Sequence, residues 1–540
     1  MRFLVLAVAF LLSLPAVADV AAPQPNSQVK ITTPMLTYEG VFLREEISAE
    51  TVYWIVQTDS GTTSVPKSTV TKVELVGSAA PKLPAVERKV EPALAKPGSL
   101  DLRIHGSNTI GAKLAPEIAR AYAEKYGLAS ATTTMGSSSE DFDVEYTTSE
   151  SDRKYIFRFQ AHGSTTAFQD LLGGVADIGM SSRRIKDEEV KLLKDQGLGD
   201  LRAPRAENVI ALDGVAVIVN KGNPVEALSL DQLFRIFSGE LQDWKQLGGT
   251  PGPITVYARD KKSGTFDTFK TLVLEGNPKR ELAGSAKRFE SSEELSDSVA
   301  ADPGGIGFIG FAYIRSAKAL RISTSCGLRF AAEPFPVKSE EYPLSRRLYF
   351  YVPETRRTSQ VNDFVAFSLS ADAQPVTSAV GFIGLNIEEA SANYTLERGQ
   401  YKNLVGATTS ASAPRLIKQF SETIDGAQRL SVTFRFNTGS TDLDNRAIED
   451  IGRLAAYIKA NPEMAQRIML FGFADPQGSF ERNLELSRDR ALQVANALSA
   501  LGIAVQQSQT YGFGVIAPVA CSDSELSLQK NRRVEVWLRH

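Results

Sequence analysis

The central part of the chain contains the segment Arg259-Asp260-Lys261-Lys262-Ser263-Gly264-Thr265-Phe266. A glycine stands here between a serine and a threonine, where an apolar run leads into a helix-like stretch. Two earlier loops also place a glycine beside Ser or Thr, Gly106-Ser107-Asn108-Thr109-Ile110 and Gly163-Ser164-Thr165-Thr166. A helix N-terminus offers unpaired N–H groups and hydroxyls add neutral donors, so such loops can replace the water shell of an oxyanion. Ser and Thr are also ordinary N-cap residues, which is the alternative interpretation of each loop taken alone.

The sequence around this segment alternates between two kinds of stretch. Apolar strand-like runs occur at residues 209–212, 215–219 and 306–309, and an amphipathic helix-like stretch occurs at 114–126. This alternation is typical of an α/β architecture. We therefore expect one cleft-forming domain over residues 100–405.

Together these segments resemble the phosphate-binding proteins of ABC importers. Residues 259–265 match the family's Arg-x-x-x-Ser-Gly-Thr segment, and further segments match in the family's order. They are Thr109-Ile110, Gly163-Ser164, Ala176-Asp177-Ile178-Gly179-Met180-Ser181-Ser182-Arg183, Ile236-Phe237-Ser238-Gly239 with Trp244, and Pro303-Gly304-Gly305-Ile306-Gly307. The resemblance covers residues 100–390. It implies a two-lobed periplasmic-binding-protein fold of type II, with the ligand between the lobes and closure by hinge motion.

The resemblance also implies which residues hold phosphate. They are Thr109, Ser164, Arg259, Ser263, Gly264 and Thr265. Arg259 would be the charged donor and the others neutral donors. Ser182 and Arg183 complete the predicted site, at the place where the best-known members have an aspartate that accepts the proton of hydrogen phosphate and repels sulfate. Phosphate is the expected ligand, while discrimination against sulfate stays open. The alternative is a retained fold with a degenerate pocket.

Residues 425–540 resemble the OmpA C-terminal family. The matching residues are Phe434-Arg435-Phe436-Asn437, Ser440, Gly472-Phe473-Ala474-Asp475-Pro476-Gln477-Gly478, Asn483, Leu486-Ser487-Arg488-Asp489-Arg490-Ala491, Gly512 and Asn531-Arg532-Arg533-Val534-Glu535. The resemblance implies an α+β sandwich that binds peptidoglycan. Asp475 would accept from the ammonium of diaminopimelate in the peptide stem and Arg490 would take its carboxylate, with Asn483 in the same site. The alternative is an intramolecular salt bridge between Asp475 and Arg490.

Four further segments complete the predicted organisation. Residues 1–18 are typical of a secretory signal peptide, because Arg2 precedes an apolar run and Ala16-Val17-Ala18 forms a small-residue cleavage site. The alternative is a membrane anchor, but the run is shorter than the ~20 apolar residues that span a bilayer. Residues 29–78 favour a small β module. The Pro-rich segment 79–99 and the Gly/Ala/Ser/Thr-rich segment 406–424 are predicted linkers.

The composition limits the partners and the chemistry. The 60 basic and 63 acidic residues leave no broad positive field for nucleic acid. His105, His162 and His540 are scattered without metal-ligand spacing, so we expect no metal, no cofactor and no enzymatic activity. Cys326 and Cys521 are the only cysteines. We predict that they form a disulfide joining the two-lobed domain to the C-terminal domain, because export supplies the oxidant; the alternative is two unrelated thiols.

The sequence therefore predicts a periplasmic protein of a Gram-negative cell that is tethered to peptidoglycan and binds phosphate or a similar oxyanion. An ABC importer or a periplasmic sensor is its expected partner, and association with the outer membrane is a further expectation. The alternative is a peptidoglycan-associated adaptor whose two-lobed domain binds a protein or a ligand other than phosphate.

Overall fold

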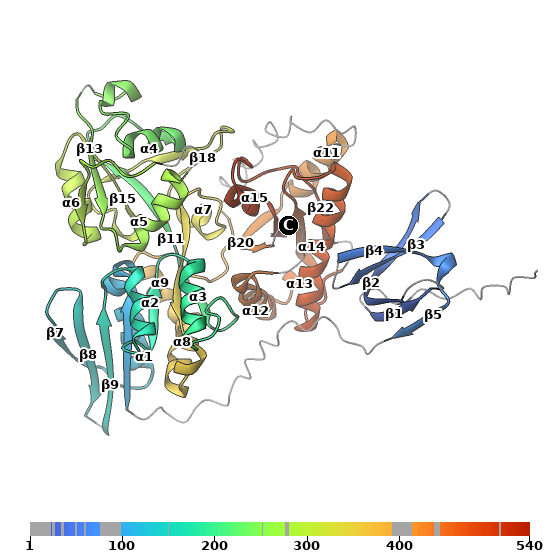
Figure 1. Ribbon diagram of the computed structural model, residues 1–540, viewed down its shortest axis with the longest axis horizontal. Coiled ribbons are helices and arrows are strands. Elements are labelled where there is room, and N and C mark those ends of the chain that lie inside the picture. Colours follow the sequence, from blue (N-terminus) through green and yellow to red (C-terminus); the bar gives the residue numbers. More distant parts are fainter. Residues whose placement is uncertain are drawn as a thin grey trace, which may run out of the picture. The chain divides into compact units, whose positions relative to one another are not determined.

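The structure is a computed structural model of the chain, shown in Figure 1. It describes residues 23, 27–33, 37–48, 51–58, 61–75, 99–149, 151–250, 252–275, 280–390, 413–436, 443–506 and 509–539. The predicted signal peptide 1–18 and linker residues 79–98 lie outside the described residues. The chain divides into two compact units, Met1–Leu94 and Ala95–His540. Within the described ranges, no helix is long and apolar enough to cross a membrane.

The first unit contains a five-stranded antiparallel sheet with the strand order β4-β3-β2-β1-β5. Its strands are β1 Gln28–Thr32, β2 Thr37–Ser48, β3 Thr51–Thr58, β4 Gly61–Pro66 and β5 Lys72–Leu75. Side chains at alternate positions, such as Val29 with Ile31 and Trp54 with Val56, are buried in one small core. The indole Nε1 of Trp54 donates to Glu45 Oε1 at 2.8 Å. These strands occupy the segment where the sequence predicts a β module.

Residues 99–390 form a two-lobed domain around an 11-stranded mixed sheet, which confirms the predicted α/β fold. The strand order is β14-β13-β15-β11-β19-β10-β6-β9-β8-β7, and β16 pairs with β11. The strands are β6 Leu100–Gly106, β7 Ser130–Met135, β8 Asp141–Thr148, β9 Ser151–Gln160, β10 Ile178–Ser181, β11 Glu207–Val219, β13 Thr255–Arg259, β14 Lys287–Phe289, β15 Gly305–Gly310, β16 Lys318–Ala319 and β19 Ser345–Tyr351. Lobe 1 contains β6–β10 and lobe 2 contains β13–β16. The hinge strand β11 pairs with β15 of lobe 2, the hinge strand β19 pairs with β10 of lobe 1, and the two hinge strands pair with each other. Figure 1 shows β11 passing from one lobe to the other.

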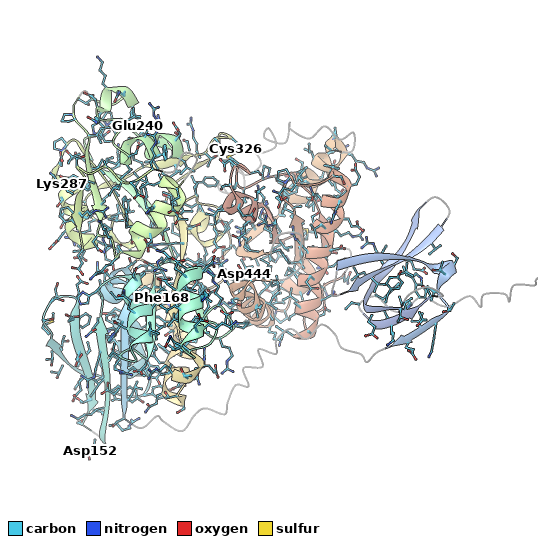
Figure 2. All side chains as sticks on the ribbon, in the orientation of Figure 1. Asp152, Phe168, Glu240, Lys287, Cys326 and Asp444 are labelled. Carbon is cyan, nitrogen blue, oxygen red and sulfur yellow. A yellow bond between two sulfur atoms is a disulfide. The ribbon has the colours of Figure 1, made fainter. Side chains whose placement is uncertain are left out.

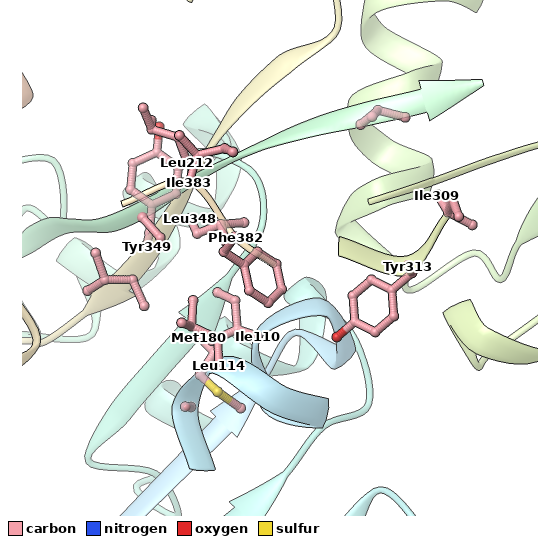
Figure 3. Packing of buried hydrophobic residues seen from close by; sticks show 14 of the residues in the cluster. Ile110, Leu114, Met180, Leu212, Ile309, Tyr313, Leu348, Tyr349, Phe382 and Ile383 are labelled. Atoms are coloured by element: carbon pink, nitrogen blue, oxygen red, sulfur yellow. The ribbon is translucent and has the colours of Figure 1, made fainter. Parts of the chain in front are cut away.

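Helices cover both lobes. Lobe 1 carries α1 Ala115–Lys125, α2 Ser164–Leu172, α3 Asp187–Asp195, α8 Ser359–Leu369 and α9 Gln374–Ala379. Lobe 2 carries α4 Leu230–Phe237, α5 Gly264–Phe269, α6 Ser292–Ala301 and a small sheet of β12 Ala227–Ser229, β17 Arg321–Ser323 and β18 Arg329–Phe330, while α7 Pro334–Lys338 precedes β19. All 13 residues of β11 are buried, because the strand is covered on both faces. The two apolar runs at 209–212 and 215–219 are therefore one strand. Figure 3 shows Leu212 of β11 and Leu348 of β19 packed near Ile110 and Met180 of lobe 1.

The C-terminal domain, residues 413–539, is the predicted α+β sandwich. Its sheet has the order β20-β23-β21-β22, with β20 Gln428–Arg435, β21 Ile468–Phe473, β22 Thr510–Gly512 and β23 Arg533–Leu538. Its helices are α11 Ala413–Ile424, α12 Asn445–Ala460, α13 Met464–Arg467, α14 Phe480–Ala500 and α15 Glu525–Asn531. Helix α11 corrects the prediction of a linker over 406–424. Leu416, Phe420 and Ile424 recur every fourth residue and pack into the core of this domain, which orders the segment as a helix.

The two-lobed domain and the C-terminal domain share a largely buried set of charges, which we call the interdomain cluster. It consists of Glu340, Glu341 and Arg347 of the two-lobed domain and Arg429, Arg435 and Arg446 of the C-terminal domain. Glu340 lies 2.5 Å from Arg347 Nε and 3.0 Å from Arg446 Nη1, and Glu341 pairs with Arg429. The side chains of Arg429, Arg435 and Arg446 are almost fully buried.

Backbone and covalent contacts join the same two domains. Ser431 N donates to Glu388 O at 2.7 Å, and Ala390 N donates to Arg429 O at 2.7 Å. Cys326, labelled in Figure 2, lies in lobe 2 between β17 and β18 and forms a disulfide with Cys521 of the C-terminal domain. Charge pairs, main-chain bonds and a disulfide thus connect the two domains.

Candidate functional site

The loops singled out in the sequence come together from both lobes. Thr109 follows β6 and Ser164 begins α2 in lobe 1, while Thr265 lies in the first turn of α5 in lobe 2. Thr109 Oγ1 lies 3.2 Å from Thr265 Oγ1, and Ser164 Oγ lies 3.3 Å from Ser182 Oγ. Side chains separated by as much as 156 residues in sequence are therefore hydrogen-bonded across the two lobes.

Gly264 is a point of close approach between lobe 2 and lobe 1. A Cβ atom at Gly264 would overlap the hydroxyl oxygens of Ser164 and Ser182. Ser263 precedes it as the N-cap of α5, where its hydroxyl accepts from Thr265 N at 3.2 Å and Phe266 N at 3.4 Å. Ser263 thus performs the capping role that the sequence left as the alternative, and Gly264 lets the capped helix end meet the serines of lobe 1.

Arg259, at the end of β13, is fully buried. Its Nη1 donates to Ser292 Oγ at 2.5 Å, its Nε to Phe289 O at 3.3 Å, and its Nη2 to Glu290 O. Burial and, to a smaller extent, the nearby charge of Arg346 together lower the pKa of Arg259 to about 10, against the opposing effect of Asp260. The structure therefore anchors this guanidinium on the segment before α6, with its positive charge in a low-dielectric position.

Arg183 lies at the contact between the lobes, with its charge already matched. Its Nε donates to Asp267 Oδ2 at 2.8 Å, and its Nη1 and Nη2 donate to the two carboxylate oxygens of Glu189 at 2.8 and 2.6 Å. Asp267 belongs to α5 of lobe 2 and Glu189 to α3 of lobe 1. Asp267 also pairs with Lys186 at 3.2 Å, and through these contacts Arg183 connects α3 of lobe 1 with α5 of lobe 2.

The residues predicted to bind the peptide stem are gathered where β21 ends and α14 packs on the sheet. Asp475 Oδ2 accepts from Arg532 Nη1 at 2.9 Å, and Asn483 Nδ2 donates to Gln477 O at 3.0 Å. Arg490 is fully buried, donates to Phe473 O at 3.3 Å and has its guanidinium 5.3 Å from the ring centre of Phe436. Burial lowers the pKa of Arg490 to about 10, while the charge of Asp475 opposes this.

Comparison with known proteins decides the family. Residues 117–372 match the PBP superfamily domain and residues 435–532 match the OmpA family. Protein SphX of Synechococcus elongatus is 32% identical over 235 residues, which are 41% of this chain and 67% of SphX. The phosphate-binding protein PstS of Pseudomonas aeruginosa is 30% identical over 246 residues, which are 42% of this chain and 74% of PstS. This chain belongs to the phosphate-binding protein family. A solved ABC-type phosphate transport receptor from Vibrio cholerae is 25% identical, with 52% of this chain and 99% of the receptor covered at a TM-score of 0.39.

Charged residues to which the sequence assigned no role contact the predicted ligands of this phosphate-binding protein family member. Arg346 of β19 donates from Nη1 to Thr265 Oγ1 at 2.8 Å, and Asp213 of β11 pairs with Arg346 at 2.6 Å. Arg532 of the OmpA family domain holds Asp475. Arg532 stands in a family motif and could have been found from it. Arg346 and Asp213 lie 133 residues apart and become neighbours only through strand pairing, so no local pattern reveals them.

Proposed function

We propose that this protein is a periplasmic oxyanion-binding protein held on the cell wall, with phosphate or a similar oxyanion bound between the lobes and diaminopimelate-containing peptidoglycan bound by the OmpA family domain. Export by a signal peptide would place it in the periplasm, associated with peptidoglycan and through it with the outer membrane. An ABC importer or a periplasmic sensor would receive the anion. Relatives named as phosphate-binding proteins support this choice of ligand.

The observation that best supports anion binding is the position of buried arginines beside the contact between the lobes. Arg259 is fully buried and Arg346 has a side chain 3% exposed, and each is near enough to affect the other electrostatically. The hydroxyls of Thr109 and Thr265 lie beside Arg346, and the hydroxyl of Ser164 lies beside that of Ser182. Asp213 balances the charge of Arg346, whereas the hydrogen bonds of Arg259 go to the hydroxyl of Ser292 and to main-chain oxygens. A buried guanidinium held by neutral groups favours a bound negative charge, because low dielectric strengthens that attraction.

Calorimetric titration of the full chain with phosphate and with sulfate tests this part. Arg259→Gln should weaken phosphate binding by roughly tenfold to a hundredfold, since a hydrogen bond to a charged group is lost. Arg321→Gln is the matched control, because Arg321 is exposed in lobe 2 and also loses one positive charge. If the folded parent binds neither anion but still pellets with the cell wall, the anion part of the proposal is wrong and the adaptor alternative is favoured.

The wall-binding part depends on Arg490 and Asp475. Truncating one member of a buried charge pair made with a ligand costs about 2–5 kcal/mol, which is roughly a thirtyfold or greater loss of affinity. Full-length Arg490→Gln should therefore stay in the supernatant when the parent sediments with purified diaminopimelate-type peptidoglycan. Arg482→Gln changes an exposed arginine of the same helix and should sediment like the parent. Equal sedimentation of folded Arg490→Gln would remove Arg490 from the site.

A further inference from the structure

The hinge of the two-lobed domain contains a buried ion pair that contacts the threonines of the candidate anion site. Asp213 of β11 and Arg346 of β19 are opposite each other in the antiparallel register. Asp213 Oδ2 accepts from Arg346 Nη2 at 2.6 Å and from Nε at 3.0 Å. The side chains are 0% and 3% exposed, so the pair is screened from water.

The same guanidinium reaches one threonine from each lobe. Arg346 Nη1 donates to Thr265 Oγ1 of lobe 2 at 2.8 Å, and Nη2 approaches Thr109 Oγ1 of lobe 1 at 3.5 Å. A hydroxyl has one hydrogen and two lone pairs. When its oxygen accepts from a guanidinium, its hydrogen stays available for another acceptor. Arg346 therefore favours the orientation in which both threonine hydrogens point away from it. The 3.2 Å hydrogen bond between Thr109 Oγ1 and Thr265 Oγ1 uses one of these hydrogens, and the other stays available for an oxyanion.

Backbone contacts fix the pair in place. Asp213 Oδ1 accepts from Phe311 N at 2.9 Å, and a Cβ atom at Gly310 would lie 2.7 Å from Asp213 Oδ2 and 3.0 Å from Arg346 Nη2. Tyr313, seen in Figure 3 with its hydroxyl turned toward the segment that holds Ile110, donates to Thr109 O at 3.0 Å. The threonine of lobe 1 is thus held at its main chain from lobe 2 and at its side chain from the hinge.

We propose that Arg346, fixed by Asp213, is a positioning residue of the anion site: from the hinge it orients the hydroxyls of Thr109 and Thr265 so that an anion is bound only when both lobes have closed on it. This inference rests on the proposed anion-binding function. Since both partners of the ion pair belong to the hinge strands, the pair stays formed while the lobes move. The threonine contacts are the part that depends on closure.

The test is phosphate titration of the full chain and of the paired variant Asp213→Asn/Arg346→Gln. The paired change keeps the net charge and nearly the volume, and it leaves no unpaired buried carboxylate that would prevent folding. We expect phosphate affinity to fall by roughly tenfold to a hundredfold. Arg346→Lys should recover part of the loss, because an ammonium can still donate to one threonine. Arg321→Gln, exposed in lobe 2, should bind like the parent.

A double-mutant cycle separates positioning from other roles. In a Thr109→Val/Thr265→Val background, the paired change at 213 and 346 should cost at most about a further threefold, because the hydroxyls through which Arg346 acts are gone. Additive losses would overturn the inference, and so would parental affinity of the paired variant in the wild-type background. If the parent itself binds neither phosphate nor sulfate, the proposed function fails and the inference fails with it; the two failures are thus distinguished by the parent alone.

Discussion

Replacing Glu340 by glutamine should destabilise the contact between the two-lobed domain and the C-terminal domain. Glu340 is 13% exposed at its side chain and lies 2.5 Å from Arg347, 3.0 Å from Arg446 and 3.7 Å from Arg435. Burial raises the pKa of Glu340, but the charges of these arginines outweigh it and hold the pKa well below the usual 4.5. Glutamine keeps the shape and removes the charge, which leaves three buried guanidinium groups around a neutral side chain.

The size of the destabilisation depends on which ion pairs remain after Glu340 is replaced. Arg347 keeps Asp444 and Arg446 keeps Asp450, at 2.8 and 3.1 Å, whereas Arg435 loses the carboxylate nearest to it in the interdomain cluster. Removing one partner from a buried ion pair costs about 3–5 kcal/mol. Because the pKa of Glu340 is lowered on folding, its contribution is complete above the ordinary carboxyl pKa and is lost as the pH falls through the folded value.

Urea unfolding of the full chain under non-reducing conditions, monitored by tryptophan fluorescence, measures the change in the free energy of unfolding. Thermal unfolding by calorimetry is a second measurement. Glu333→Gln is the matched control, since Glu333 is exposed just before α7 and its side chain makes no capping hydrogen bond. The control should change the free energy of unfolding by less than about 0.5 kcal/mol. A loss below about 1 kcal/mol in Glu340→Gln, with an unchanged dependence on urea, would show that the cluster does not stabilise the contact.

Three further changes give separate tests. Lys530 donates to Tyr342 O at 2.9 Å, and burial lowers its pKa from 10.5 to about 7. Between these two values the unfolded chain binds a proton that the folded chain lacks, so the free energy of unfolding should rise with pH across that range. Lys530→Met should flatten this slope when unfolding is measured as a function of pH. Cys326→Ser/Cys521→Ser opens a loop of 195 residues and should lower the free energy of unfolding by roughly 5 kcal/mol in non-reducing urea titrations, while reduction of the parent should give the same result. Gly472→Ala would place a Cβ atom against the Ser487 carbonyl of α14, so it should lower the midpoint of thermal unfolding by the equivalent of about 1–3 kcal/mol and reduce pelleting with peptidoglycan.

The fold was accessible from the sequence wherever a local pattern determines structure. The amphipathic stretch at 114–126 predicts α1. The loops with glycine beside Ser or Thr predict the meeting of Thr109, Ser164 and Gly264, because a residue without a Cβ lets two segments approach closely. Helix α11 was missed because its apolar residues follow a Gly/Ala/Ser/Thr-rich run that is typical of a linker. Whether these loops bind an anion stays a prediction.

The features that the sequence did not predict depend on ion pairs between residues far apart in the chain, which produce no local sequence pattern. Asp213 and Arg346 are ordinary polar residues within apolar strands until β11 and β19 pair. Glu340 and its partner Arg446 are more than a hundred residues apart and belong to different domains. Ion pairs of this kind have no characteristic spacing, so only the assembled structure shows them.

The interdomain cluster has a consequence for how the two domains can be studied apart. A C-terminal fragment produced without the two-lobed domain would expose Arg429, Arg435, Arg446 and Lys530, which are buried in the intact chain or held by the other domain. The excised C-terminal fragment would then present a new basic face, and such a face adheres to acidic polymers without any specific site. Sedimentation of that fragment with cell-wall material would report this adhesion together with stem recognition. Only the intact chain, in which the basic face stays covered, separates the two.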